Sequence, residues 1–261
     1  MKFAPVLSEK YDPAKLTNYH LILANEIVDN HSYANYYSTL GSEHTILLDS
    51  GTVEIGYADA EMIQAAMEIL NREVRVVAPD FLGDKVRTIT ETELFLEQDW
   101  CPEKDNLMIV PQGETSEEWI SCFDYLDLHY NERFKWVGIP RISEDFVGGR
   151  SWLYQNVMQI HRRRRGMNDQ PKIHLLGIQH TIDEIEWAKH FSSRIEGVDS
   201  SAPLKAAEAN LLCSEVKDFR LLTDIDVDPV EEVVSSRIQE MVDYASFEWS
   251  FKSHEDLSNG A

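Results

Sequence analysis

The chain has 261 residues, and 43% of them are hydrophobic, which is enough for a sizeable core and excludes a wholly disordered protein. Asp and Glu (46) outnumber Lys and Arg (24), giving a formal charge of −22, so a protein held on nucleic acid by overall positive charge is excluded as well. Apolar runs stay far below the roughly 20 residues that cross a membrane, and no membrane partner is expected.

The cysteines and the N-terminal segment indicate a compartment. Cys101, Cys122 and Cys213 lie far apart without a CxxC pair, which argues against a disulfide framework and a cysteine-based zinc site. The first residues lack the long apolar stretch of a signal peptide. We therefore predict a cytoplasmic protein with reduced cysteines.

Short apolar runs recur along the chain at similar intervals. Most are apolar on consecutive residues, as expected of strands buried on both faces of a parallel sheet. The predicted strands are residues 20–24, 45–49, 74–80, 107–112, 136–139, 173–178, 194–199 and 219–224.

Helical patterns fill the gaps between these runs. Apolar residues spaced three and four apart predict amphipathic helices over residues 63–70, 119–130 and 230–245. Ser116 begins one helix, Thr181 with Glu184 forms a capping box, and Gly166 ends a helix rich in arginine.

Eight strands alternating with helices predict an α/β protein with a (β/α)₈ TIM-barrel fold. The alternative is a doubly wound open sheet, but no GxGxxG or GxxxxGK[ST] motif follows a strand. We predict a single catalytic domain over residues 1–261, with its core from about residue 20 to 245 and a C-terminal tail over about 247–261.

In a barrel, the residues that end the strands form the active site. Three aspartates directly end buried runs, where each could instead cap the following helix. Together they favour a shared site. The predicted strand-end set is Asp49 with Ser50 and Gly51, Asp80, Gln112, Gly138, Gly177, and Asp199 with Ser200 and Ser201.

The residue types limit the chemistry. The histidines form no HxH or HExxH pattern for a metal hydrolase, and His174, inside a strand, is interpreted as a packed core residue. No GxSxG motif supports a serine nucleophile. Paired carboxylates remain, as in retaining glycosyl transfer, and Asp with Gln suits the polar edge of a purine.

Six short motifs then occur in order between about residues 46 and 203. They are Leu48-Asp49-Ser50-Gly51, Pro79-Asp80, Val110-Pro111-Gln112-Gly113, Val137-Gly138-Ile139, Leu175-Leu176-Gly177-Ile178 and Gly197-Val198-Asp199-Ser200. This order resembles the tRNA-guanine transglycosylases and their relatives that exchange guanine for a 7-deazaguanine in DNA.

The resemblance implies base exchange by double displacement, with no redox cofactor and no catalytic metal. Asp199 matches the nucleophile that attacks C1′, and Asp49 matches the carboxylate that contacts the base and shuttles protons. The implied substrate-binding residues are Asp80 and Gln112 at the guanine edge, the Gly138 N–H near O6, Leu176 under the base, and Ser50 and Gly177.

Several residues differ from the family pattern, and these differences favour one branch of the family. Thr52 and Val53 stand where the family has a glycine and a stacking aromatic residue. Cys213 stands alone, so we expect the zinc subdomain that helps to hold tRNA to be absent. A catalytic barrel without the regions that bind tRNA favours the DNA-modifying branch. Its compact members are often phage-encoded, which would place this chain in a host cytoplasm, where the modified base can block restriction nucleases.

An acidic chain needs local cations to hold DNA. The predicted phosphate contacts lie on loops after strands: Lys85, Arg87, Arg141, Arg150 and Lys205. The run Arg162–Arg165 is expected at the far end of the barrel, where it suits a helix C-terminus or binds a protein partner or distal DNA. The alternatives left open are a tRNA-guanine transglycosylase, a metal-assisted barrel hydrolase and a non-catalytic partner subunit.

Overall fold

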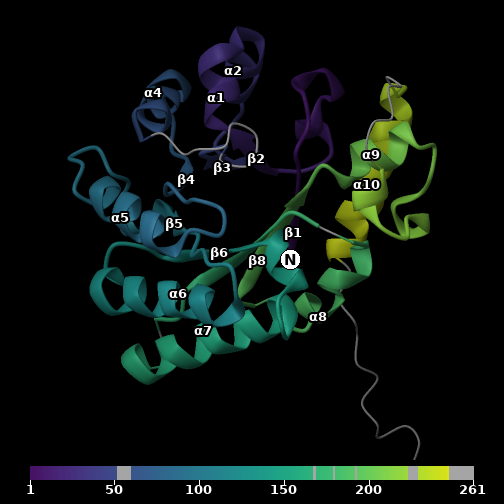
Figure 1. Cartoon of the computed structure of the whole chain (residues 1–261). Helices are drawn as coiled ribbons and strands as arrows, with labels where there is room; N and C mark the ends of the chain where they lie inside the picture. Colours follow the sequence, from purple (N-terminus) through teal and green to yellow (C-terminus); the bar gives the residue numbers. More distant parts are fainter. Residues whose placement is uncertain (52–59, 167–168, 179, 192, 223–228, 247–261) are drawn as a thin grey trace, which may run out of the picture.

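The computed structural model describes residues 1–51, 60–166, 169–178, 180–191, 193–222 and 229–246. Its centre is one parallel sheet of eight strands in the order β1-β8-β7-β6-β5-β4-β3-β2 (Figure 1). The strands are β1 (Lys2–Pro5), β2 (Tyr19–Leu23), β3 (Thr45–Asp49), β4 (Arg75–Val77), β5 (Leu107–Ile109), β6 (Trp136–Pro140), β7 (Lys172–Leu176) and β8 (Ile195–Ser200). Since β1 also lies beside β2, the sheet is a nearly closed barrel, and the predicted (β/α)₈ fold is confirmed.

Among the described residues, helices surround the sheet (Figure 1). The α-helices are α1 (Ala24–Asp29), α2 (His31–Ser38), α4 (Ala60–Leu70), α5 (Lys85–Leu96), α6 (Ser116–Tyr130), α7 (Gly149–Arg165), α8 (Glu186–Lys189), α9 (Ala202–Glu208) and α10 (Glu231–Ser246). The 3₁₀ turns are Glu9–Tyr11, Pro13–Lys15, Lys104–Asn106, Arg141–Asp145, Ile182–Ile185, Cys213–Glu215 and Phe219–Leu221. The three predicted amphipathic helices are confirmed as α4, α6 and α10. None of the helices described here is long and apolar enough to cross a membrane.

One strand prediction was wrong. Residues 219–221 form a 3₁₀ turn, and 223–224 lie outside the described residues. Phe219 is buried because it packs on the barrel from a loop, so its apolar neighbours do not mark a strand. The eighth strand is instead β1 at the N-terminus, and the core begins at residue 2 instead of residue 20. The predicted tail, 247–261, also lies outside the described residues.

Side chains on alternate strand positions fill two separate regions. Those that point outward pack under the helices, whereas those that point inward fill the barrel, with Tyr19, Met108 and Trp136 in its interior. A Cβ on Gly138 would lie 2.8 Å from both Leu176 Cδ1 and Val110 Cγ2. Glycine in β6 therefore lets Leu176 close over the packed interior.

Phe3 tests the contribution of β1 to the barrel wall. Its side chain is 2% exposed and belongs to the core between strands and helices. We expect Phe3→Ala to lower the free energy of unfolding by about 3–5 kcal/mol, because a large buried ring leaves a cavity. Val86→Ala, at a side chain that is 72% exposed, should stay within about 0.5 kcal/mol. Urea unfolding measures both, and equal values would contradict the placement of β1.

Candidate active site

A cavity of about 410 Å³ opens at the carboxyl ends of the strands. Residues from β3, β7 and β8 line it, together with residues from the loops that follow β4, β5 and β6. The predicted site residues that line this one cavity are Asp49, Asp80, Gln112, Arg141, Leu176, Gly177, Asp199, Ser200, Ser201 and Lys205. Residues from six different strand ends thus meet at one place, as parallel strands of a barrel require.

Asp199 lies near the end of β8, with only 6% of its surface exposed. Its Oδ1 atom is 2.9 Å from Nε2 of His174 and accepts a hydrogen bond of 3.2 Å from the Gly177 N–H. Gly177 has a φ of +70°, a conformation in which glycine is favoured, and this turn aims its N–H at the carboxylate. Asp199 is therefore held on one oxygen, beside a cavity.

His174 is the site residue that sequence reasoning missed. It is buried in β7, as a core residue would be, but its ring contacts Asp199. The available signal was its position two residues before Leu176, which puts both side chains on the same face of the strand. The partner on β8 could not be identified from the sequence of β7 alone.

Asp49 ends β3 on another side of the cavity. Its Oδ1 atom accepts hydrogen bonds from the Gly51 N–H at 3.3 Å and from the Ser50 hydroxyl at 3.4 Å. Ser50 is buried behind Asp49 and does not line the cavity. Thr52 and Val53, the expected departures from the family, lie outside the described residues.

Asp80 and Gln112 form a fixed polar pair. The Gln112 side-chain amide donates from Nε2 to Asp80 Oδ2 at 2.6 Å, and its Oε1 accepts from the Gly83 N–H at 3.3 Å. The Gly83 contact sets which way the amide faces, so Nε2 keeps a second N–H beside the Asp80 carboxylate. A neighbouring pair of acceptor and donor is what the polar edge of a planar heterocycle requires.

Arg141, after β6, and Lys205, in α9, lie on the cavity wall. Burial lowers the pKa of Lys205, and the positive charge of Arg141 lowers it further. Arg220 also lines the cavity, but it is paired with Asp218 at 2.7 Å. Arg141 and Lys205 therefore form a cationic part of the wall of the cavity that Asp199 also lines.

The other predicted phosphate contacts lie elsewhere. Arg150 is 1% exposed, so its assignment to the rim was wrong: it is buried beneath the site and donates to the Gly177 carbonyl at 2.7 Å. Lys85 donates to the Ser121 hydroxyl at 2.8 Å, and Arg87 lies 3.7 Å from the ring centre of Phe81. None of the three lines the cavity, and neither does Gly138.

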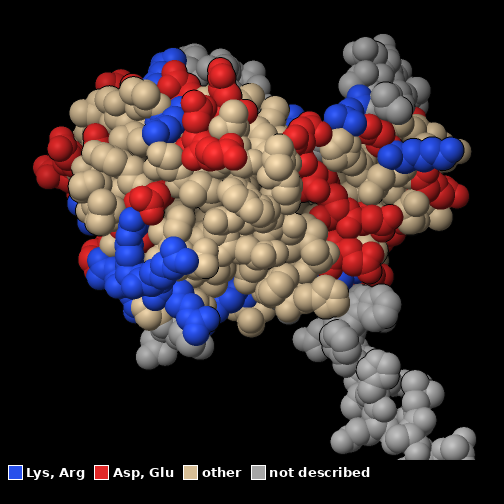
Figure 2. Space-filling view, turned by 60° about the horizontal axis from the view of Figure 1, so that its bottom comes forward, with Lys and Arg blue, Asp and Glu red and all other residues tan. Residues whose placement is uncertain are grey.

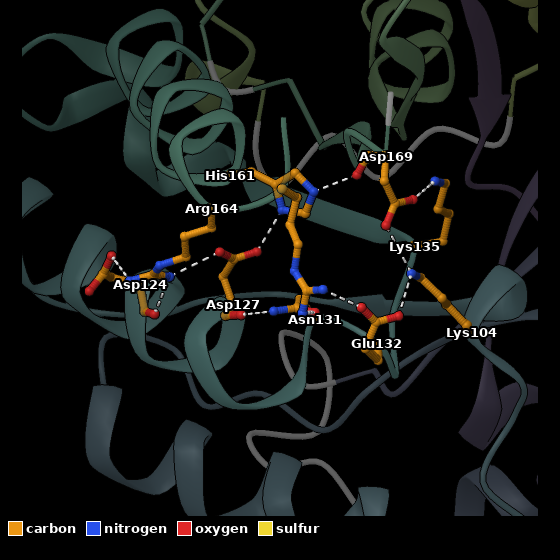
Figure 3. A network of polar contacts seen from close by, with 10 residues as sticks. Lys104, Asp124, Asp127, Asn131, Glu132, Lys135, His161, Arg164 and Asp169 are labelled. Atoms are coloured by element: carbon orange, nitrogen blue, oxygen red, sulfur yellow. Dashed lines mark hydrogen bonds and ion pairs between the residues drawn. The ribbon is translucent and has the colours of Figure 1, made fainter. Parts of the chain in front are cut away.

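The arginine cluster of α7 lies at the opposite end of the barrel, as expected, where Lys and Arg side chains gather on the surface (Figure 2). Part of it is held in a network (Figure 3). Arg164 pairs with Asp124 and Asp127, and Arg165 pairs with Glu132. His161 bridges Asp127 and the Asp169 carbonyl, and Asp169 pairs in turn with Lys135, just before β6. The network therefore ties α6 and α7 together at the amino ends of the strands.

No family model and no curated protein matches the chain. Within the described ranges, no group of three or more His, Cys, Asp or Glu side chains is placed to hold a metal ion. The function is therefore inferred from the residues that line the cavity.

Lys205 gives a test of the cationic wall. An amine with a lowered pKa loses its charge at a lower pH than an ordinary lysine, so Lys205 should react with an acylating reagent from a lower pH upward. Arg141→Gln should move its titration back toward the ordinary value. Lys15, whose pKa is raised by its hydrogen bond to Asp12, is the internal control. Competitive labelling read by mass spectrometry checks this, and identical titration of both lysines would contradict it.

Proposed function

We propose that this protein exchanges guanine in DNA for a 7-deazaguanine base, such as 7-cyano-7-deazaguanine, by double displacement through a covalent bond to Asp199. The observation that carries the proposal is one cavity lined by two separate carboxylates, Asp49 and Asp199, and by the Asp80–Gln112 pair. A carboxylate that attacks, a second one that handles protons and a heterocycle-binding edge are the parts that retaining base exchange needs.

In the first half of the reaction, Oδ2 of Asp199 attacks C1′ of the target nucleotide. The C1′–N9 bond breaks, its electron pair stays on guanine, and Asp49 supplies the proton that the departing base takes up. In the second half, N9 of the 7-deazaguanine attacks C1′ and gives its proton to Asp49. The C1′–O bond then breaks and its electron pair returns to Asp199, so two inversions retain the configuration.

The base edge is assigned to the fixed pair. The Asp80 carboxylate accepts from N1–H and the exocyclic amine, while the second N–H of Gln112 Nε2 donates to O6. Leu176 provides an apolar floor for the ring. The 7-substituent of a deazaguanine leaves this edge unchanged, so one pocket can hold both the leaving and the entering base.

Arg141 and Lys205 are assigned to phosphates beside the nucleophile. Because C1′ is shielded inside a duplex, the target nucleotide has to be flipped out or lie in a single strand. With a net charge of −22, the protein alone should bind DNA weakly and with strong dependence on salt, which leaves room for a protein partner that adds affinity.

The central test is base exchange itself. Protein is incubated with 7-cyano-7-deazaguanine and either guanine-containing DNA or tRNA, and the digested nucleosides are read by mass spectrometry. We expect the modified deoxynucleoside from wild type and none from Asp199→Ala or Asp199→Asn, because neither side chain can form the ester. Modification of tRNA alone would move the proposal to the tRNA branch, and no product with any 7-deazaguanine would overturn it.

Base selectivity tests the assigned edge. Hypoxanthine lacks the exocyclic amine, so wild type should incorporate labelled guanine in preference to labelled hypoxanthine by about 10- to 100-fold. Asp80→Asn should reduce this preference to a few-fold. Asp84→Asn is the matched control: Asp84 is exposed on the same loop and caps α5, and Asn caps a helix equally well. Unchanged selectivity in Asp80→Asn would contradict the assignment.

A further inference from the structure

Behind Asp199 lies a chain of buried side chains inside the barrel. The Tyr19 hydroxyl is 2.8 Å from Nδ1 of His174, and Nε2 of the same ring is 2.9 Å from Asp199 Oδ1. Tyr19 and His174 are fully buried, on β2 and β7, while Asp199 is on β8. A line of hydrogen bonds thus runs from the packed interior to the edge of the cavity.

The direction of these hydrogen bonds follows from the donors available. Among the described residues, His174 is the hydrogen-bond partner of the Tyr19 hydroxyl. Burial raises the pKa of Tyr19 well above its ordinary value, so the phenol keeps its proton and donates a hydrogen bond to Nδ1. A proton on Nδ1 instead would leave the Tyr19 O–H buried without an acceptor. The neutral ring therefore carries its proton on Nε2 and donates a hydrogen bond to Asp199.

We propose that Tyr19 and His174 are positioning residues that fix Asp199 as a nucleophile through its Oδ1 atom and leave Oδ2 as the attacking oxygen. This inference rests on the proposed function of Asp199. Oδ1 accepts two N–H donors, from His174 and from Gly177, whereas Oδ2 accepts none from the described residues. The carboxylate cannot rotate without giving up both bonds.

The second donor is held from below. The Gly177 carbonyl accepts from the Arg150 guanidinium at 2.7 Å, and Arg150 also lies 3.5 Å from Glu184. This buried contact fixes the turn that points the Gly177 N–H at Asp199. Arg150 is therefore another part of the support of Asp199 and not a phosphate contact.

The two halves of the reaction need this support differently. No proton moves along the hydrogen-bonded line from Tyr19 through His174 to Asp199. When Oδ2 bonds to C1′, Asp199 loses its negative charge, and when the C1′–O bond breaks, that charge returns to a carboxylate that accepts two N–H bonds. Donors aimed at returning charge make Asp199 a better leaving group. Loss of the His174 donor should therefore slow the breakdown of the glycosyl–enzyme more than its formation.

The experiment compares His174→Leu, which removes the donor, with His174→Gln, whose side-chain N–H₂ can replace Nε2–H. We expect His174→Leu to exchange bases about 100-fold more slowly than wild type and His174→Gln to recover to within about 10-fold. Tyr19→Phe should lose about 5-fold, as for one buried hydrogen bond. In His174→Leu, the covalent adduct seen on a denaturing gel should persist longer after free guanine is added.

His20→Leu is the matched control. His20 is equally buried and belongs to β2, but its ring pairs with His44 at 2.9 Å, away from the cavity. We expect its exchange rate to stay within a few-fold of wild type, and circular dichroism checks that each variant is folded. Equal losses in His174→Leu and His174→Gln, or an adduct that decays at the wild-type rate, would overturn the positioning role.

A direct measurement separates this inference from the proposed function. Nitrogen-15 NMR of histidine-labelled full-length protein, with the His174 signals assigned through His174→Gln, should show the proton on Nε2. A proton on Nδ1 would contradict the proposed direction even if exchange activity is normal. Wild-type protein that exchanges no base would overturn the proposed function and, with it, the positioning role of Tyr19 and His174, while the NMR result would still decide the direction of the hydrogen bonds.

Discussion

The barrel interior is packed with large side chains at one end, and the site depends on this constraint. Trp136 begins β6, its indole N–H donates to the Asp105 carbonyl, and the Arg75 guanidinium lies 4.1 Å from its ring centre. With Tyr19 and Met108 it fills the amino ends of the strands. The interior is then closed above by Leu176, which fits because Gly138 has no side chain. The space left over is the cavity at the carboxyl ends.

The charges around this cavity form two groups. Asp49, Asp80 and Asp199 face it from three strand ends, while Arg141 and Lys205 stand on its wall. Carboxyl groups that face one cavity are accommodated when hydrogen-bond donors or cations face them. Each of the three has such donors: the Gly51 N–H and the Ser50 hydroxyl for Asp49, an amide for Asp80, and a ring and a backbone N–H for Asp199. The cavity is polar because of its backbone as well as its side chains.

Much of this arrangement could be predicted from the sequence, because consecutive apolar residues mark parallel strands and the polar residues that end them must meet. Asp49, Asp80, Gln112 and Asp199 line one cavity for this reason. The prediction fails where a contact partner comes from elsewhere in the chain. Arg141 and Arg150 both follow β6 in the sequence, yet Arg150 lies in α7 and its buried guanidinium donates to the Gly177 carbonyl. From the sequence of β7, His174 cannot be told from a core histidine. Only the neighbouring β8 shows that its ring contacts Asp199.

The pairing of β1 has a consequence for how the chain reaches this structure during synthesis. Lys2 pairs with Gly197 and Pro5 with Ser200, so β1 cannot pair with β8 until β8 has been synthesised. Between β1 and β2 there are only 3₁₀ turns, so no helix of its own covers the early strand. Because such distant pairing closes a long loop, it is slow to form. In a nascent chain, β2 to β7 are therefore synthesised while the barrel is still an open sheet. A chaperone that binds exposed sheet edges would meet the chain in that form.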